Sequence, residues 1–502
     1  ESPEGTTFNV VFTEDTIGNR TWILKRFGLY TGARFTGAAG KDYFETFKPY
    51  GAKFLQVNVI NATGPVKINK IGMVSQIYPY EKSGMFECSD PLMNRIWEMG
   101  WRTLEVCSED TYTDTPYRER GLYAGDALPQ YAIALVTSGD SRLMKRSIRV
   151  FADMYRDMMM PQAERRKASV NHMADYPLAT LISYLWSVAM TKDIEFAEEF
   201  YEGYRNMLLN YMDRQLESGL YDHDRAFIEW TQIDKNANLT TIQSMIIYSL
   251  ESFTWLADEL GYSDDAAKFR KEASRAKEIM LEKCWDDEEL AFHDGFREGE
   301  QIDHNYPISS AWPVIFGQTN EMQEKHIKDH FIKTLTEIGD EDRKRATTPY
   351  GAFYILEALY KLGMEDFAEF FMRKYWSPMI YKHNDTPWEN FGDGSDGSGQ
   401  GTLSHAWSGH PTYFMSTRVL GVRLGFPEID FHDKIFIKPQ SANITWAKGI
   451  VPHTMGLVEV DWRIAGDKLF LNYSAPEGAE VIVEPRGKLA EKELIVNEKP
   501  MT

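Results

Sequence analysis

The stretch Asp114-Thr-Pro-Tyr-Arg-Glu-Arg-Gly-Leu-Tyr-Ala-Gly-Asp126 combines three acids and two arginines within thirteen residues. Much later in the chain, Thr386-Pro-Trp-Glu389 places an acid directly beside an indole. Hydrolysis of a glycosidic bond with inversion requires one protonated carboxyl, which donates to the leaving oxygen, and one carboxylate roughly 6.5–9.5 Å away, which activates water. We therefore interpret the two segments as the two halves of a sugar-cleaving site.

The order of residues in these segments resembles the signature of the bacterial α-L-rhamnosidases, the inverting six-hairpin enzymes of glycoside hydrolase family 78. The matching positions are Asp114, Pro116, Arg118, Glu119, Arg120, Gly125 and Asp126, then Trp388-Glu389, then Leu403-Ser404-His405-Ala406-Trp407. Many members carry Cys where this chain has Thr115, Trp where it has Tyr123, and Arg-Trp where it has Asn390-Phe391. These positions shape the sugar pocket, so the differences bear on which sugar is cut.

The resemblance implies a role for each residue of the site. Glu119 is expected to be the general acid and Glu389 the general base. The residues expected to bind the sugar are Asp114, Arg118, Asp126, Tyr123, Trp230, Trp388 and His405. In Phe227-Ile-Glu-Trp230, Glu229 stands where members of the family have Asp.

Each of these residues also has a purely structural interpretation. Glu119 could belong to a salt-bridge cluster at a helix start, and Asp114 could cap that helix. Glu389 could be a surface acid beside a core tryptophan, and His405 a core histidine. Neighbouring cations favour the ionised form of a carboxyl, whereas burial and neighbouring acids favour the protonated form that a general acid needs. Glu119 therefore fits its role best if Arg118 and Arg120 turn toward the two aspartates.

The composition narrows the possible functions. The net charge of −20 argues against a nucleic-acid partner and fits a neutral sugar better than an anionic one. The aromatic share of 13% suits sugar faces, although large helical domains are often rich in aromatic residues. The three cysteines predict no disulfide framework and are most simply small buried residues, and no metal-ligand spacing or cofactor motif is present.

Helical periodicity dominates the middle of the chain. Amphipathic spacing begins at Asp90 and recurs in ranges that end at about residue 420: 125–138, 141–159, 177–190, 194–216, 240–260, 264–283, 307–316, 321–338, 350–362, 365–376 and 409–420. About a dozen helices suggest six hairpins, and periodicity alone leaves an open helical array as an alternative. The resemblance implies that the hairpins close into an (α/α)₆ barrel.

Strand patterns flank the helices. Alternation over 8–12, 54–60 and 66–71 predicts an N-terminal β-sandwich that lacks some strands, and alternation over 435–437, 457–464, 469–473 and 481–483 predicts a C-terminal β-sandwich. We therefore expect a mainly α chain with three parts: a β-sandwich over 1–84, the catalytic (α/α)₆ barrel over 85–425 and a second β-sandwich over 426–502. The Gly-, Asp- and Ser-rich loop 392–401 is expected to be a flap over the site.

The leading hypothesis is an inverting exo-glycosidase that releases terminal α-L-rhamnose from oligosaccharides, polysaccharides or plant glycosides. The first alternative is a barrel glycosidase of similar type that acts on another sugar. The second is a carbohydrate-binding protein without turnover, and the presence of both proposed acids argues against it. No run of 18 apolar residues predicts a membrane span, and no leader is recognisable. The oligomeric state and the compartment (periplasmic, secreted or cytoplasmic) stay open.

Overall fold

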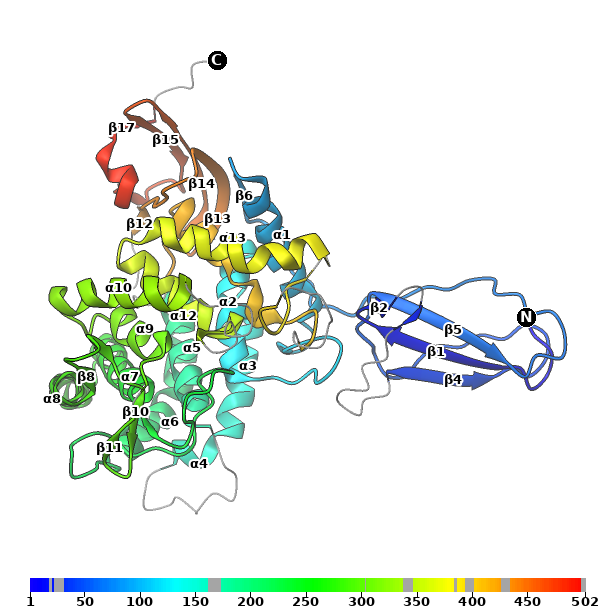
Figure 1. Cartoon of the computed structure of the whole chain (residues 1–502), viewed down its shortest axis with the longest axis horizontal. Coiled ribbons are helices and arrows are strands. Elements are labelled where there is room, and N and C mark those ends of the chain that lie inside the picture. Colours follow the sequence, from blue (N-terminus) through cyan, green and yellow to red (C-terminus); the bar gives the residue numbers. More distant parts are fainter. Residues whose placement is uncertain are drawn as a thin grey trace.

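A computed structural model describes residues 1–17, 20–21, 31–160, 173–302, 304–336, 346–382, 386–392, 401–425 and 434–497. Two β-sheet regions adjoin a helical body (Figure 1). The region formed mainly by the C-terminal strands lies beside the helices, and the N-terminal region projects away from them. Most of the predicted flap, 393–400, lies outside the described residues. Among the described residues, no helix is both long and apolar enough to cross a bilayer.

The projecting region is an antiparallel sheet of three strands in the order β4 (Gly32–Thr36), β1 (Thr7–Thr13) and β5 (Phe54–Ile60). A short hairpin, β2 (Thr16–Ile17) and β3 (Arg20–Thr21), continues from β1. The strands predicted over 8–12 and 54–60 are confirmed. The strand predicted over 66–71 is wrong, because its alternating apolar side chains meet no core: Ile68 and Ile71 are exposed and the segment is irregular.

The helical body consists of paired helices, as the periodicity predicts. Their bounds are α1 (Pro91–Val106), α2 (Ala124–Thr137), α3 (Arg142–Met154), α4 (Arg156–Met159), α5 (Asp175–Thr191), α6 (Ile194–Met212), α7 (Thr240–Glu259), α8 (Ser263–Cys284), α9 (Pro307–Ile315), α10 (Glu321–Thr336), α12 (Pro349–Lys361), α13 (Glu365–Lys382) and α14 (Pro411–Phe414). The predicted helix 409–420 instead comprises a 3₁₀ turn (Ala406–Gly409), α14 and a π turn (Met415–Val419), since Pro411 can only begin a helix here.

The helices form an inner and an outer layer, which explains two kinds of sequence pattern. α2, α5, α7, α9, α12 and α14 are buried on nearly every side, whereas α3, α6, α8 and α10 bury one face only. Each of the six inner helices contacts the next, and α14 contacts α2. The inner layer is therefore a closed ring, and the fold is the expected (α/α)₆ barrel.

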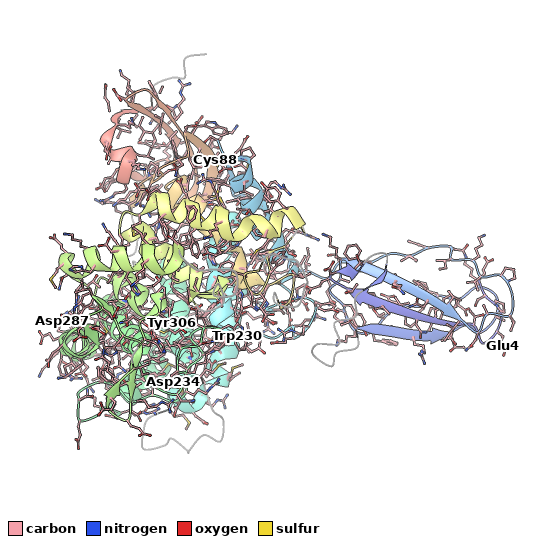
Figure 2. All side chains as sticks on the ribbon, in the orientation of Figure 1. Glu4, Cys88, Trp230, Asp234, Asp287 and Tyr306 are labelled. Atoms are coloured by element: carbon pink, nitrogen blue, oxygen red, sulfur yellow. The ribbon has the colours of Figure 1, made fainter. Side chains whose placement is uncertain are left out.

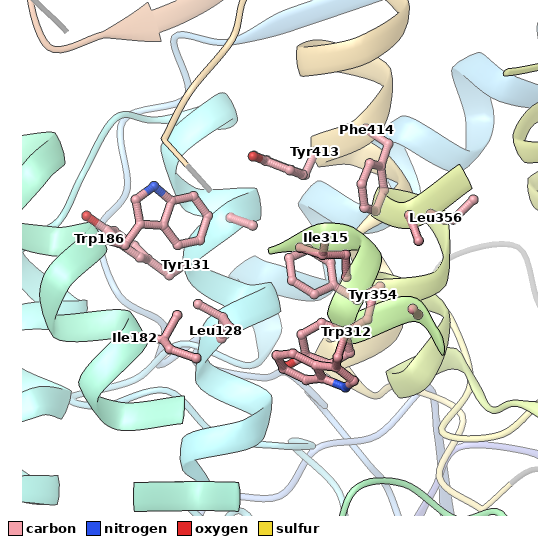
Figure 3. Close-up of a cluster of buried hydrophobic side chains, with 14 of the residues drawn as sticks. Leu128, Tyr131, Ile182, Trp186, Trp312, Ile315, Tyr354, Leu356, Tyr413 and Phe414 are labelled. Carbon is pink, nitrogen blue, oxygen red and sulfur yellow. The ribbon is translucent and has the colours of Figure 1, made fainter. Parts of the chain in front are cut away.

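Apolar side chains of the inner helices fill the inside of this ring. The rings of Trp186 of α5 and Tyr413 of α14 lie 6.0 Å apart, and Trp312 of α9 packs on Tyr354 of α12 at 4.0 Å (Figure 3). Side chains of this size dominate the energetics of a core, since each buries roughly 150–250 Å². The barrel interior is thus a packed core, and the polar residues of the predicted site must lie at one of its ends.

The C-terminal part contains a five-stranded sheet in the order β17 (Glu493–Val496), β15 (Lys468–Ser474), β14 (Gly456–Ala465), β13 (Trp446–His453) and β6 (Met85–Cys88), and β12 (Lys434–Ile437) pairs with β16 (Glu480–Val483). The four strand ranges predicted here are confirmed, whereas β13 and β17 were not predicted. β6 precedes the first helix in sequence but pairs with β13. One strand of this sheet, β6, therefore precedes the barrel helices in the sequence, and the other four follow them.

Among the described residues, one short pairing of two-residue strands and one small sheet lie in the loops of the barrel. β8 (Trp285–Asp286) pairs with β9 (Ala291–Phe292), and β7 (Asn238–Leu239), β10 (Gly295–Arg297) and β11 (Glu300–Gln301) form the small sheet. The three cysteines are free and buried, as the sequence analysis expects.

Candidate functional site

The first motif forms a turn between α1 and α2. Residues 116–119 are in turn conformation, so Glu119 does not begin a helix. Asp114 does not cap α2 either, because its carboxylate accepts a hydrogen bond from the backbone N–H of Gly121 at 2.8 Å. The backbone N–H of Asp114 donates to the carbonyl of Gly121 at 3.0 Å. These two bonds close the turn and hold Glu119 at its tip.

Two aspartates of the motif lie buried beneath the turn. Burial raises the pKa of Asp114 to about 7, with a further increase from the charge of Asp126, although His405 acts in the opposite direction. Asp126 lies in the first turn of α2, and burial raises its pKa too, against the hydrogen bond and charge of His405. Oδ2 of Asp114 has no hydrogen-bond partner among the described residues. This oxygen is itself buried in the structure.

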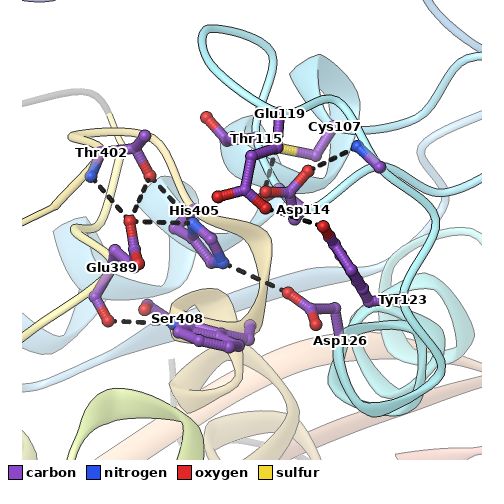
Figure 4. Close-up of polar contacts among 12 residues, drawn as sticks. Cys107, Asp114, Thr115, Glu119, Tyr123, Asp126, Glu389, Thr402, His405 and Ser408 are labelled. Atoms are coloured by element: carbon purple, nitrogen blue, oxygen red, sulfur yellow. Dashed lines mark hydrogen bonds and ion pairs between the residues drawn. The ribbon is translucent and has the colours of Figure 1, made fainter. Parts of the chain in front are cut away.

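Glu389 is buried on a loop that follows α13, opposite the first motif (Figure 4). Its Oε2 accepts hydrogen bonds from the backbone N–H and the hydroxyl of Thr402, at 2.9 and 3.2 Å. Its backbone N–H donates to the carbonyl of Thr402, and its carbonyl accepts from the indole N–H of Trp407. Glu389 is thus held on both its main chain and its side chain, and the interpretation as a surface acid does not apply.

Arg118 joins the two proposed catalytic acids. One nitrogen of its guanidinium lies 3.0 Å from Oε2 of Glu389, and another contacts Glu119. The condition under which Glu119 best fits the acid role, with both arginines turned toward the aspartates, is not met in this structure, because Arg118 contacts Glu119 itself. Asp114 and Asp126 already have partners in Gly121 and His405, and Arg120 reaches Glu109 and the carbonyl of Pro49 instead. A planar guanidinium suits two carboxyls because its donors point along separate edges.

Glu119 is the more accessible of the two acids. Its side chain is 36% exposed, against 8% for Glu389. The hydroxyl of Tyr123 donates to Glu119 Oε2 at 2.9 Å, and burial followed by this hydrogen bond raises the pKa of the phenol. Tyr123, one of the departures from the family pattern, therefore contacts the proposed proton donor directly. Solvent or a leaving group can reach Glu119, whereas Glu389 is enclosed.

His405 links the two halves of the site. Its Nε2 lies 3.2 Å from Oδ1 of Asp126, and its Nδ1 lies 2.9 Å from the hydroxyl of Thr402 (Figure 4). Burial lowers the pKa of His405, but the hydrogen bond to Asp126 and the charges of Glu389 and Asp126 outweigh burial, so the pKa is raised overall. The neighbouring acids therefore favour the protonated form of the ring.

The two tryptophans of the proposed sugar wall differ in exposure. Trp230, labelled in Figure 2, is 54% exposed on its loop. Its ring stacks edge-to-face on Phe227. Trp388 is fully buried, and its carbonyl accepts a hydrogen bond from Ser408. Direct contact with a sugar is open to Trp230 in this structure, whereas Trp388 packs beneath Glu389. Both sugar contacts stay predictions.

The loop that carries Trp230 includes a residue with a strained backbone and is held by hydrogen bonds to a buried acid. Ile228 has a φ of 58°, which is rare for a β-branched residue. The buried carboxylate of Asp175 accepts the backbone N–H groups of both Phe227 and Ile228 at 2.8 Å. Glu229 turns inward to Thr347 and Thr348, and burial raises its pKa to about 7. Backbone strain of this kind is concentrated at functional sites. This fits the predicted contact between the sugar and Trp230, the residue after Glu229.

Two residues of the site, Thr402 and Glu14, belong to no motif that could be recognised in the sequence. Thr402 contacts Glu389 and His405 from a loop with no recognisable motif. Glu14 follows β1 of the projecting sheet, and its carboxylate accepts the backbone N–H of Leu403 at 2.9 Å. Glu14 and Leu403 are 389 positions apart in the chain, and a single sequence without homologues cannot show that two such distant residues are in contact. Only the tertiary structure therefore identifies Glu14 as part of the site.

The barrel and the cluster of acids at its end define a family. The model of the bacterial α-L-rhamnosidase six-hairpin glycosidase domain matches residues 81–419, and that of the bacterial α-L-rhamnosidase C-terminal domain matches residues 427–494. The first match covers most of the chain. The chain therefore belongs to the bacterial α-L-rhamnosidase family of six-hairpin glycosidases.

Individual relatives agree with this membership. An α-L-rhamnosidase of Formosa agariphila is 21% identical, over 92% of this chain and 50% of the relative. The structure of a family 78 rhamnosidase of Bacillus sp. GL1 has a TM-score of 0.86 at 24% identity, over 99% of this chain and 52% of that chain. An α-L-rhamnosidase of Streptomyces avermitilis has a TM-score of 0.75 at 17% identity, over 96% and 46%. The chain spans about half the length of the curated relatives it matches.

Proposed function

We propose that the chain is an inverting exo-glycosidase that releases terminal α-L-rhamnose. The observation that carries the proposal is the pair of carboxyls from separate elements, the accessible Glu119 and the enclosed Glu389, which contact one guanidinium. An inverting enzyme needs two such carboxyls, because the acid must reach the leaving oxygen while the base activates water on the opposite face of the sugar. The inverting separation of roughly 6.5–9.5 Å between the two carboxyls stays a prediction.

In the proposed reaction, Glu119 donates its proton to the glycosidic oxygen as the bond to the anomeric carbon breaks. Glu389 accepts a proton from the water that attacks that carbon, and the products are the free sugar and the alcohol. Asp114, Arg118, Asp126 and His405 hold the sugar hydroxyls by charge-assisted hydrogen bonds, which are the stronger kind. The Streptomyces avermitilis structure, with L-rhamnose bound, supports a neutral sugar as the ligand.

One observation, the contact between Tyr123 and Glu119, favours a substrate whose terminal sugar is not L-rhamnose. The phenol lies where many members of the family have an indole, and it adds a hydrogen-bond donor beside the acid. Assays on a panel of nitrophenyl glycosides test both possibilities. The α-L-rhamnoside should be cut fastest. If another glycoside exceeds it by about tenfold, the sugar assignment is wrong while the two-acid mechanism still holds, and if no glycoside is cut, the binding-protein alternative gains support.

A further inference from the structure

Glu14 brings the projecting β-sheet into the site. It is the residue after β1, its side chain is buried, and its Oε2 accepts the backbone N–H of Leu403. Its charge interacts with those of His405, Glu389 and Arg118. The other oxygen, Oε1, is buried and has no hydrogen-bond partner among the described residues. A carboxyl from outside the barrel thus lies against the loop that carries the proposed base.

Leu403 belongs to the segment that fixes Glu389. Its neighbour Thr402 makes three hydrogen bonds with Glu389, through its backbone N–H, its hydroxyl and its carbonyl. Thr402 also contacts His405. A shift of the main chain at 402–403 would therefore move the carboxylate of Glu389. Within this segment, the N–H of Leu403 is the point at which the β-sheet region holds the loop.

Burial raises the pKa of Glu14 to about 8, although the Leu403 hydrogen bond and the charges of His405 and Arg118 act in the opposite direction and that of Glu389 adds to the increase. At neutral pH the group is therefore mainly a neutral carboxylic acid. A neutral acceptor can hold Leu403 without placing a second full negative charge beside Glu389.

The same end of the β-sheet region also contacts the turn that carries Glu119. The backbone N–H of Gly51 donates to the carbonyl of Pro116 at 3.0 Å, and Arg120 donates to the carbonyl of Pro49 at 2.8 Å. The hydroxyls of Thr31 and Tyr117 lie 3.1 Å apart. The loops of both proposed catalytic acids are therefore bonded to one external element.

We propose that Glu14 is a positioning residue of the active site, and that through Leu403 it holds the loop that places the base Glu389. The proposal rests on the proposed glycosidase function and adds to it. The barrel then supplies the two reacting acids, and the N-terminal β-sheet region sets the position of one of them. Glu14 acts through Leu403 and is not itself a reacting group.

The test uses the full chain with Glu14→Ala and Glu14→Gln. The amide carbonyl of Gln can accept the Leu403 N–H and is neutral, as the native carboxyl is. Glu14→Ala should lower kcat by about 10- to 100-fold, the range expected when a catalytic group is misplaced by roughly 1 Å, and should leave KM nearly unchanged. Glu14→Gln should stay within about threefold of the parent. The control Glu4→Ala removes an exposed acid at the far end of the same region (Figure 2) and should have no effect.

A second readout separates this proposal from the function on which it rests. Amide hydrogen exchange over 401–405 should be faster in Glu14→Ala than in the parent and unchanged in Glu4→Ala, whether or not any glycoside is cut. If Glu14→Ala does not fold, Glu14→Asp, which is one methylene too short to reach Leu403, replaces it. Parent-like kcat and exchange in the folded variant would overturn the role of Glu14, as would a Glu14→Gln variant as impaired as Glu14→Ala. A parent that cuts no glycoside would overturn only the proposed function.

Discussion

The guanidinium of Arg118 lies 3.0 Å from the carboxylate of Glu389, although the two residues are 271 positions apart in the chain. The same guanidinium contacts Glu119, its neighbour in sequence. One side chain therefore joins the accessible acid on the turn after α1 to the enclosed acid on the loop after α13.

Arg118→Lys should reduce kcat/KM on an α-L-rhamnoside by about 10- to 100-fold, since misplacement of a catalytic group typically has this effect. An ammonium keeps the charge but lacks the planar fork that serves two carboxyls. Steady-state kinetics measure the loss. Arg102→Lys, a change at an arginine exposed on α1 and paired with Glu105, is the matched control and should behave as the parent. Parent-like activity of Arg118→Lys would show that the bridge is not needed.

Glu119→Gln and Glu389→Gln should differ in their dependence on the leaving group. Without its proton donor, Glu119→Gln should lose about 10²–10⁴-fold on an alkyl rhamnoside and far less on a nitrophenyl rhamnoside, whose leaving oxygen needs little protonation. Glu389→Gln should slow both substrates alike, because both need activated water. Azide should rescue Glu389→Gln and should not rescue Glu119→Gln on alkyl substrates. Equal proportional losses in both variants would refute the separate roles.

The first-formed sugar should have the inverted anomeric configuration. Glu119 and Glu389 lie on separate elements, and a single displacement by water inverts the anomeric carbon without a covalent intermediate. Proton NMR during the first minutes of hydrolysis, before mutarotation, distinguishes the anomers. Retention of configuration would exclude Glu389 as a base for water.

Gly401→Ala should abolish most of the activity. A Cβ at Gly401 would lie 2.3 Å from Oε2 of Glu389, a distance at which the carboxylate must move. Gly363→Ala is a close control, since its φ of 69° nearly equals the 70° of Gly401 while no atom lies within 4 Å of the added Cβ. Both variants should lose roughly 1 kcal/mol of stability from left-handed strain. Only Gly401→Ala should have a kcat below that of the parent. Equal kcat values for Gly401→Ala and Gly363→Ala would disprove the steric argument.

The stability of the parent relative to Glu14→Gln should fall as the pH rises from about 5 to about 8. The folded-state pKa of Glu14, about 8, lies above the usual value of 4.5. The stability linked to its proton is thus fully present below about pH 4.5 and is lost as the pH rises toward about 8. The largest possible slope is about 1.4 kcal/mol per pH unit. Denaturation of both chains at several pH values measures it.

Much of this protein was predictable from sequence because the determining patterns are local. The inner helices α5 and α7 are buried on nearly every side, and the outer helix α3 is buried on one face, and the spacing of their apolar residues predicted both their existence and their approximate ends. The strand at 66–71 failed because alternation favours a strand only where a core covers one face, and nothing covers Ile68. The motif around Glu119 placed the residue types of the site, but not their partners.

The sequence by itself determined the helices, the flanking strands and the acids that a family of glycosidases would use. Only the tertiary structure decided how those acids are partnered. Arg118 contacts Glu119 and Glu389, whereas His405 and Gly121 contact the two aspartates. Glu14 joined the site because the end of β1 meets the loop at Leu403. Periodicity reports which face of an element is buried, whereas contacts between residues hundreds of positions apart depend on how the chain closes on itself.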